Sequence, residues 1–145
     1  MFWTDWGATP KIEKSTLNGI QRVALVTSNL QWPNGITLDR QNRLVFWVDA
    51  GTDRLESIDY HGNNRTLLYQ QAGLHPFGVT FLSPYLFVSE WTTKGVYKLN
   101  ASSGVVLGNV FFRGISCRNT PAVFKSFHDL PSIPSHPIGG CYTVH

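Results

Sequence analysis

Two carboxylates stand at matching places in the sequence, where a pair of acids could act as general acid and general base. Asp5 ends the tetrapeptide 2–5 (Phe-Trp-Thr-Asp), and Asp49 ends the similar tetrapeptide 46–49 (Phe-Trp-Val-Asp), 44 residues later. A catalytic pair needs both carboxyl groups beside one reacting bond. Because these two belong to successive copies of a repeated unit, we expect them to lie apart. Each is expected to accept backbone N–H groups and to tie neighbouring strands together.

The two cysteines, Cys117 and Cys141, are the next candidates for chemistry. In an oxidising compartment they could form one disulfide, which closes a loop of about 24 residues and is worth roughly 3 kcal/mol in the entropy model. Together with His128, His136 and His145 they could also be imagined as zinc ligands, but their spacings match no Cys-x-x-Cys pattern. We therefore expect a Cys117–Cys141 disulfide and no metal.

Motifs for nucleophilic or phosphate chemistry are not found. The segment 114–117 (Gly-Ile-Ser-Cys) begins like a Gly-x-Ser-x-Gly nucleophile elbow, but the pattern fails at its last position. No phosphate-binding loop and no His-Glu-x-x-His pair occurs either. The sequence therefore predicts a protein that is not an enzyme and uses no cofactor.

Three sequence markers recur in the same order and with nearly the same spacing, and they define the elements that carry these residues. The first marker is the tetrapeptide at 2–5 and 46–49, with a degraded copy at 87–90. The second is Pro33–Leu38, which is matched by 76–81. The third is Lys11–Lys14, which is matched by 54–57 and 95–98. One similar tetrapeptide is weak evidence, but three markers in phase indicate an internal repeat of about 43 residues.

Each repeat has the pattern of four short strands. In the best-defined copy we expect strands over 35–39, after a Pro-Asn-Gly turn, and over 43–49, 54–60 and 65–70. Four strands in about 40–45 residues, repeated, are typical of a β-propeller blade. The sequence thus predicts an all-β fold with about 2.5–3 four-stranded antiparallel blades over residues 1–112. An irregular, proline-containing tail is expected over 113–145.

Composition excludes several other classes. The 145 residues are 42% hydrophobic and 14% charged, which suits one packed domain rather than a disordered chain. The net charge is only +3, and no Lys/Arg cluster could follow a phosphate backbone, so a nucleic-acid partner is not expected. The longest apolar stretch, 105–112, is far shorter than the ~20 residues of a membrane span. We expect neither a span nor a secretion signal within this chain.

The repeats resemble a known family. The tetrapeptides resemble the Tyr-Trp-Thr-Asp repeat of the low-density lipoprotein receptor family (class B repeats). The segments Trp32–Asp39, Ile58–Arg65 and His75–Thr80 resemble that family's inner-strand motifs and its Asp-Gly-x-x-Arg turn. The combination is most similar to the receptor-related proteins of the family and covers roughly residues 1–112.

The resemblance implies a six-bladed propeller in the extracellular part of a single-pass endocytic or signalling receptor. EGF-like modules flank such propellers, and the ligands are proteins or lipoproteins. Only about half of a ring is present, so the remaining blades of a parent receptor are expected partners. Two alternatives stay open: an extracellular matrix interaction protein of the nidogen kind and, less favoured, a propeller hydrolase of the gluconolactonase kind.

Four residues are the candidate ligand contacts, because they flank the glycine turns that lead into the inner strands. They are Trp32, Asn34, His75 and Phe77. In relatives this Trp and Asn lie on the face used for ligands, where an Asn could pair with an amide and a Trp could anchor the ligand. The alternative is that Trp32 packs under its loop and Asn34 only serves its turn.

The remaining motif residues have an expected structural role. The large aromatic side chains are expected to pack between blades, and the acids that follow them to hold strand ends; Glu90 has one methylene more than the aspartates it replaces. These residues are Phe2, Trp3, Asp5, Phe46, Trp47, Asp49, Phe87 and Glu90. Two glycosylation sequons, at Asn64 and Asn100, modestly favour an extracellular protein.

Overall fold

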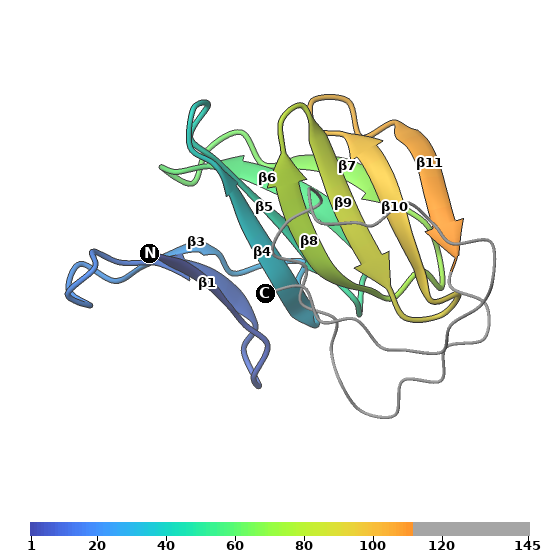
Figure 1. Cartoon of the computed structure of the whole chain (residues 1–145). Coiled ribbons are helices and arrows are strands. Elements are labelled where there is room, and N and C mark those ends of the chain that lie inside the picture. The colour runs from blue at the N-terminus through green and yellow to red at the C-terminus, as the bar shows by residue number, and fades with distance from the viewer. Residues whose placement is uncertain (112–145) are drawn as a thin grey trace. The chain divides into compact units, whose positions relative to one another are not determined.

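The structure is a computed structural model that describes residues 1–111, in which the chain forms three antiparallel sheets (Figure 1). The first sheet contains β1 (Phe2–Asp5), β2 (Lys11–Lys14) and β3 (Val23–Val26). The second contains β4 (Pro33–Asp39), β5 (Leu44–Asp49), β6 (Arg54–Asp59) and β7 (Thr66–Gln70). The third contains β8 (Pro76–Leu82), β9 (Tyr85–Glu90), β10 (Gly95–Asn100) and β11 (Val106–Phe111).

Each sheet is a meander in which sequence neighbours are also spatial neighbours. The second and third sheets repeat the same four-stranded order, and β1–β3 match the last three strands of the others, since Asp5, Asp49 and Glu90 end β1, β5 and β9. Described residues 1–111 contain no helix. The predicted all-β, blade-like architecture is confirmed, and we call the three sheets blade 1, blade 2 and blade 3.

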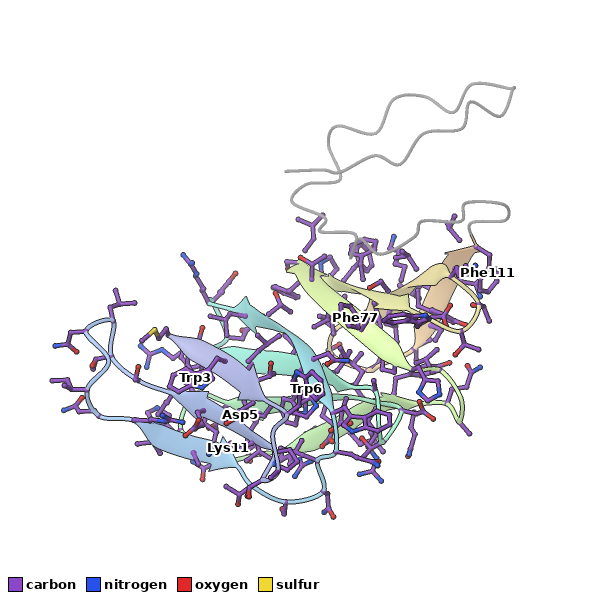
Figure 2. The ribbon with its side chains drawn as sticks, turned by 90° about the horizontal axis from the view of Figure 1, so that it is seen from below. Trp3, Asp5, Trp6, Lys11, Phe77 and Phe111 are labelled. Atoms are coloured by element: carbon purple, nitrogen blue, oxygen red, sulfur yellow. The ribbon has the colours of Figure 1, made fainter. Side chains whose placement is uncertain are left out.

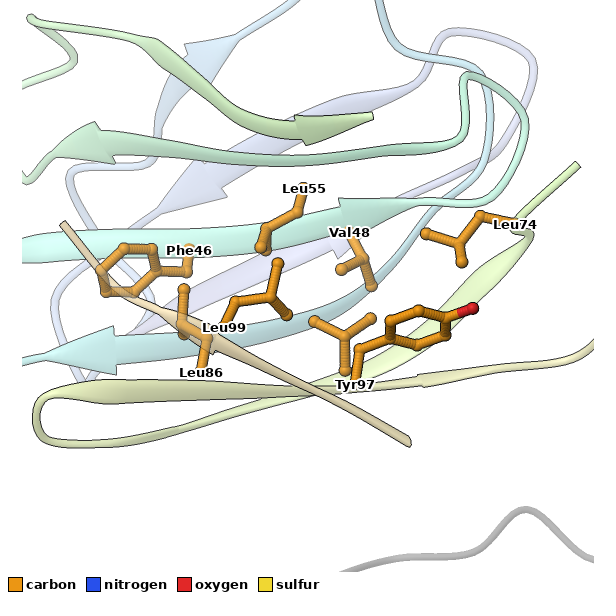
Figure 3. Packing of buried hydrophobic residues seen from close by; sticks show 8 residues of the cluster. Phe46, Val48, Leu55, Leu74, Leu86, Tyr97 and Leu99 are labelled. Atoms are coloured by element: carbon orange, nitrogen blue, oxygen red, sulfur yellow. The ribbon is translucent and has the colours of Figure 1, made fainter. Parts of the chain in front are cut away.

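Two hydrophobic cores lie on opposite sides of blade 2. On the blade 1 side, Ile12 and Val26 pack with Val45, Trp47 and Ile58. On the blade 3 side, the core residues are Phe46, Val48, Leu55, Leu74, Leu86, Val88, Tyr97 and Leu99 (Figure 3). Because successive side chains of a strand point to opposite faces, the adjacent aromatic residues Phe46 and Trp47 serve one core each. Burial of each ring contributes roughly 2–3 kcal/mol.

The inner strands β4 and β8 approach one another closely at a glycine. A Cβ on Gly35 would lie 2.7 Å from the backbone nitrogen of Val79 and 2.9 Å from Cα of Gly78. Only a residue without a side chain fits there. The Pro-Asn-Gly and Pro-Phe-Gly segments of the repeat therefore mark a close backbone contact between neighbouring blades.

The strand limits correct one detail of the sequence prediction. Pro33–Gly35 is not a turn before the inner strand: β4 already begins at Pro33, which pairs with Asp49, and a register shift separates this pair from Ile36–Trp47. The same irregularity recurs between Pro76 and Gly78 in β8. Asn34 and Phe77 thus stand in bulged strand starts, where an extra residue bends the strand.

Smaller differences concern strand ends. The strands predicted over 43–49, 54–60 and 65–70 are each one residue shorter, at Leu44–Asp49, Arg54–Asp59 and Thr66–Gln70. Arg43 is excluded because its φ of 54° is left-handed. A search of residues 1–111 finds no helix with the length and apolarity that a bilayer crossing needs.

Candidate functional site

The candidate contact residues lie at one end of the strands, which we call the lower face because it is at the bottom of Figure 1. It is formed by the five connections 6–10, 27–32, 50–53, 71–75 and 91–94. The other connections form the upper face: 15–22, 40–43, 60–65, 83–84 and 101–105. Figure 2 views the molecule from below, onto the lower face.

Asp49 fixes the part of this face that carries Trp32. Its buried carboxylate accepts the backbone N–H groups of Gln31 at 2.8 Å and Trp32 at 3.0 Å. It also accepts those of Gly51 at 2.9 Å and Thr52 at 3.0 Å. One carboxylate thus joins two neighbouring connections, and four N–H donors satisfy its charge without a counter-ion.

The side chain of Trp32 is exposed although its backbone is held on both sides. Its carbonyl accepts the N–H of Ala50 at 3.0 Å, opposite the bond that its own N–H makes to Asp49. The residue is 46% exposed. A rigid backbone with an exposed aromatic ring loses little conformational entropy on binding, which suits an anchor for a partner.

Asn34 lies beside Trp32 in the bulged start of β4. Its carbonyl accepts the hydroxyl of Thr4 at 2.8 Å, which ties blade 2 to blade 1. Within residues 1–111 its side-chain amide makes no hydrogen bond, and the residue is partly exposed. The amide therefore offers two donors and an acceptor next to an exposed ring.

His75 takes the corresponding place before β8. Asp53 accepts the backbone N–H groups of Gly73 at 2.6 Å and of His75 at 2.8 Å. The ring Nδ1 of His75 lies 3.0 Å from the carbonyl oxygen of Ala50 and 3.5 Å from the Asp53 carboxylate. His75 thus stands at the junction of connections 50–53 and 71–75, in a left-handed conformation with φ of 46°.

Phe77 belongs to a larger aromatic group than the sequence indicated. Its ring meets Trp91 edge to face, with centroids 5.7 Å apart, and both are exposed, Trp91 by 70%. Trp6, in connection 6–10, is 62% exposed (Figure 2). Trp6 and Trp91 were not among the predicted contact residues, although a signal was available: each directly follows the acid that ends a motif strand.

Four exposed aromatic residues therefore lie on the lower face, one or two from each blade: Trp6, Trp32, Phe77 and Trp91. Tryptophan is enriched in binding hot spots. The arrangement can bind a partner through aromatic contacts and the amide of Asn34. It brings together no pair of carboxylates suited to general acid–base chemistry, since Asp49 is saturated by N–H donors.

The other motif acids hold only their own turns. Glu90, which is buried, accepts the N–H and hydroxyl of Thr93 and the N–H of Gly95. Its carboxylate therefore lies in connection 91–94 and does not reach connection 71–75. Asp53 binds the backbone N–H groups of that connection instead. Asp5 accepts the N–H of Gly7 at 3.0 Å and lies 3.6 Å from Lys11.

An arginine completes the motif in blades 1 and 2; Arg65 was expected only as the last residue of the Asp-Gly-x-x-Arg turn, and its pairing with a glutamate was not predicted. Arg65 pairs with Glu56 at 2.6 and 2.9 Å and lies over Trp47, with Cζ 5.5 Å from the ring centroid. In blade 1, Arg22 pairs with Glu13 and lies 5.4 Å from the centroid of Trp3. The signal was the Glu-to-Arg spacing of nine residues in both copies.

Trp3 and Phe87 occupy the two outer faces of the described blades. Trp3 is partly exposed and lies on the side of blade 1 opposite the Ile12 core. Phe87 is partly exposed on the side of blade 3 opposite Leu86 and Val88. Neither packs between two described blades as Phe46 and Trp47 do.

Both sequons belong to the upper face. Asn64 is exposed in connection 60–65, and Asn100 ends β10. Asn100 accepts the N–H and hydroxyl of Ser102 through its side-chain oxygen, at 3.0 and 2.7 Å. Glycans at these positions would leave the lower face free.

Two carboxyl groups outside the lower face have shifted pKa values. The backbone N–H of Asn63, that of His61 and the amide of Asn64 lower the pKa of Asp59. The hydrogen bonds from Arg22 lower the pKa of Glu13, against the opposing effect of burial. Both groups are therefore charged at neutral pH and serve as structural acceptors.

Residues 1–111 contain no cluster of three or more His, Cys, Asp or Glu side chains that could hold a metal ion. The predicted disulfide, Cys117–Cys141, and the three tail histidines considered as zinc ligands lie outside the described residues.

Comparison with known proteins identifies one family model and several related proteins. The model of the family described as low-density lipoprotein receptor repeat class B matches residues 1–40 and 43–80. The chain is 35% identical over 104 residues to the vitellogenin receptor Yl of Drosophila melanogaster, covering 72% of this chain and 5% of that protein. It is 33% identical over 109 residues to a human low-density lipoprotein receptor-related protein 5-like protein, covering 73% of this chain and 43% of the relative.

A solved structure extends the comparison to three dimensions. A chain in the crystal structure of a nidogen/laminin complex is 33% identical and superimposes with a TM-score of 0.71 over 76% of this chain and 42% of that chain. The sequence printed here thus spans only a part of each of these relatives.

Proposed function

The chain belongs to the low-density lipoprotein receptor class B repeat family, and from this premise we propose that it is a non-catalytic ligand-binding segment of an extracellular receptor of the receptor-related kind. Its ligands are proteins or lipoproteins, held on the lower face. In this proposal the receptor serves in endocytosis or signalling, and further blades of the same kind cover the two outer faces.

One observation carries the proposal: the side chain of Trp32 is exposed while both polar groups of its backbone are hydrogen-bonded. A residue that only packed under its loop would be buried. The partly exposed amide of Asn34 and the Phe77–Trp91 pair extend this anchor across two blades. An aromatic centre with a few directional polar groups is the usual composition of a binding hot spot.

The class of relatives supports a receptor. Both protein relatives reported above are receptors or receptor-like by name, and one is a vitellogenin receptor. Vitellogenin and low-density lipoprotein are therefore the first probes for this chain. The extracellular location is supported by two sequons on the upper face, where glycans would not obstruct the ligands.

A matrix role is the second candidate, because the nidogen/laminin complex contains a chain of the same fold at 33% identity. Under this alternative, the lower face would bind a laminin-like glycoprotein of the matrix instead of a circulating ligand. The two candidates differ in the probe that binds and share the binding surface.

The test uses the full chain and a double variant, Trp32→Ala with Asn34→Ala. Immobilised chain is titrated with vitellogenin, low-density lipoprotein and laminin. We expect at least one lipoprotein probe to bind and the double variant to weaken binding at least tenfold, which corresponds to about 1.4 kcal/mol. Leu67→Ala, on the exposed side of β7, is the matched control. Equal binding by the double variant and wild type contradicts the site, and laminin binding alone favours the matrix role.

A further inference from the structure

One position of the repeat differs from blade to blade in the way its charge is paired. It is the first residue of the strand that follows the motif strand, directly opposite the motif acid. The three pairs are Asp5 with Lys11, Asp49 with Arg54, and Glu90 with Gly95. Directly opposed residues of antiparallel strands point to the same side of a sheet. A cation at this position therefore lies beside the acid, at the end of the strands that belongs to the lower face.

Arg54 is a cation without a partner in the described chain. In blade 1 the equivalent Lys11 lies 3.6 Å from the carboxylate of Asp5. The carboxylate of Asp49 instead accepts backbone N–H groups and forms no ion pair with Arg54. Within residues 1–111 Arg54 makes neither a hydrogen bond nor an ion pair, and its Nε atom is buried without an acceptor. The donors of this guanidinium therefore remain free for a ligand.

Arg54 stands close to the part of the lower face that carries Trp32. Its side chain points to the side of blade 2 that also carries Glu56, because side chains alternate along a strand. Connection 27–32 crosses this side, and the backbone N–H groups of Gln31 and Trp32 bind Asp49 there. Arg54 is partly exposed. The unpaired cation and the exposed indole thus adjoin the same buried carboxylate.

The other charges of the lower face have the same bias. Each of its acids accepts at least one backbone N–H group; they are Asp5, Asp49, Asp53 and Glu90. Lys94 is exposed in connection 91–94 and makes no ion pair within residues 1–111. The unpaired charges on this face of the described chain are therefore positive. Complementary charge on a partner contributes to the specificity of an interface.

A carboxylate is the group that suits Arg54. The planar guanidinium matches the two oxygens of a carboxylate, and such charge-assisted hydrogen bonds are roughly twice as strong as neutral ones. A protein segment with Asp or Glu can at the same time place an apolar side chain on Trp32 and a backbone amide against the side chain of Asn34. The phosphate groups of a lipid surface would offer no such amide.

We infer that the lower face selects acidic protein segments, in which one Asp or Glu carboxylate pairs with Arg54 and a neighbouring apolar side chain packs on Trp32. The inference rests on the proposed function, since it names the chemistry of the ligand for the same surface. Arg54 is then a specificity-determining residue, because the ligand carboxylate supplies the acceptors that Asp49 does not. Lys94 adds a second positive charge on blade 3, toward which an acidic segment is attracted.

The test titrates the immobilised full chain with vitellogenin, low-density lipoprotein and laminin. For each probe that binds, we expect Arg54→Gln to weaken binding at least tenfold and Arg54→Lys to recover part of the loss. Arg40→Gln is the matched control, because it removes an exposed arginine from the upper face, and it should bind within twofold of wild type. Since Arg54 makes no hydrogen bond in the described chain, Arg54→Gln should unfold at the same urea concentration as wild type.

The double variant of Trp32 and Asn34 separates this inference from the proposed function. Loss of binding in the double variant with full binding in Arg54→Gln overturns the acidic ligand and leaves the proposed function in place. Full binding in both variants overturns both. Failure of all three probes to bind the wild-type chain also counts against both.

A second measurement needs no variant and therefore remains decisive if Arg54→Gln does not fold. The carboxyl groups of the bound probe are converted to neutral amides with glycinamide, and acetylation of its amines is the control. We expect the amidated probe to bind at least tenfold more weakly and the acetylated probe to bind as before. Unchanged binding after amidation overturns the inference. So does a loss that follows phosphatase treatment and not amidation, because the recognised anion is then a phosphate.

Discussion

Arg65 lies over the ring of Trp47, with its Cζ atom 5.5 Å from the ring centroid, and the same guanidinium forms two hydrogen bonds to the carboxylate of Glu56. Glu56 is buried, and Arg65 is the cation paired with its carboxylate. Breaking such a pair from one side leaves an uncompensated buried charge. The contact therefore links the interface between two blades to the stability of the whole described region.

Arg65→Met tests this dependence. We expect the free energy of unfolding to fall by about 3 kcal/mol, since removal of one partner from a buried pair costs roughly that amount. Chemical denaturation followed by tryptophan fluorescence measures it. The matched control is Lys11→Met, which removes the same charge from the partly exposed Asp5–Lys11 pair and should cost less than about 1 kcal/mol. Equal losses for both variants would contradict the assigned role of Arg65.

Gly35→Ala tests the close approach of β4 and β8. The added Cβ would lie 2.7 Å from the Val79 backbone nitrogen, and neither strand can move without disturbing a sheet. We expect a loss of about 1–3 kcal/mol, typical of overpacking. Gly108→Ala is the control, because nothing lies within 4 Å of its Cβ position. If the two variants unfold at the same urea concentration, the inner strands are farther apart than described.

The lowered pKa values of Glu13 and Asp59 predict a loss of stability in acid. A carboxyl group whose pKa is lower in the folded chain stabilises that state above its unfolded pKa, about 4. This contribution disappears as the pH falls through the folded value. Thermal unfolding from pH 7 to pH 2 should show a decline that begins near pH 4–5. Glu13→Gln and Asp59→Asn should each flatten it, and an unchanged decline in both variants would refute this origin.

The placement of the sequons predicts that glycans do not affect ligand binding. Secreted from animal cells, the chain should carry glycan at Asn64 and Asn100, and Asn64→Gln and Asn100→Gln should each remove one mass increment. Lipoprotein binding should stay within twofold of wild type, because both residues belong to the upper face. A gain of binding after enzymatic deglycosylation would show that the upper face takes part.

The internal repeat was the feature from which the strands and the contacts between blades could be predicted. Alternating apolar residues and recurring turn signals placed the strands of blade 2 within one or two residues, and the aromatic pair Phe46–Trp47 was correctly expected at the blade contacts. The prediction of a turn at the Pro-Asn-Gly segment is wrong, because β4 begins at Pro33. Its glycine serves a close approach to β8, a long-range contact that no local turn signal can distinguish.

The site was less accessible to sequence reasoning. Trp32 and Phe77 were selected by their neighbouring glycines, whereas Trp6 and Trp91 stand in connections whose side-chain exposure depends on the packing of other blades. Glu90 stands where blades 1 and 2 have Asp, and the sequence alone does not show where its longer side chain places the carboxylate. The extra methylene turns the carboxylate into its own connection, and Asp53 holds the His75 segment instead.

Hydroxyl-radical footprinting of the lipoprotein-bound chain tests the central claim most directly. Bound ligand should protect the exposed aromatic side chains of the lower face from oxidation, above all Trp32, Phe77 and Trp91. His61 and Leu67, which are exposed away from that face, should be oxidised as in the free chain. Protection of His61 and Leu67 with undiminished oxidation of Trp32 would contradict ligand binding on the lower face.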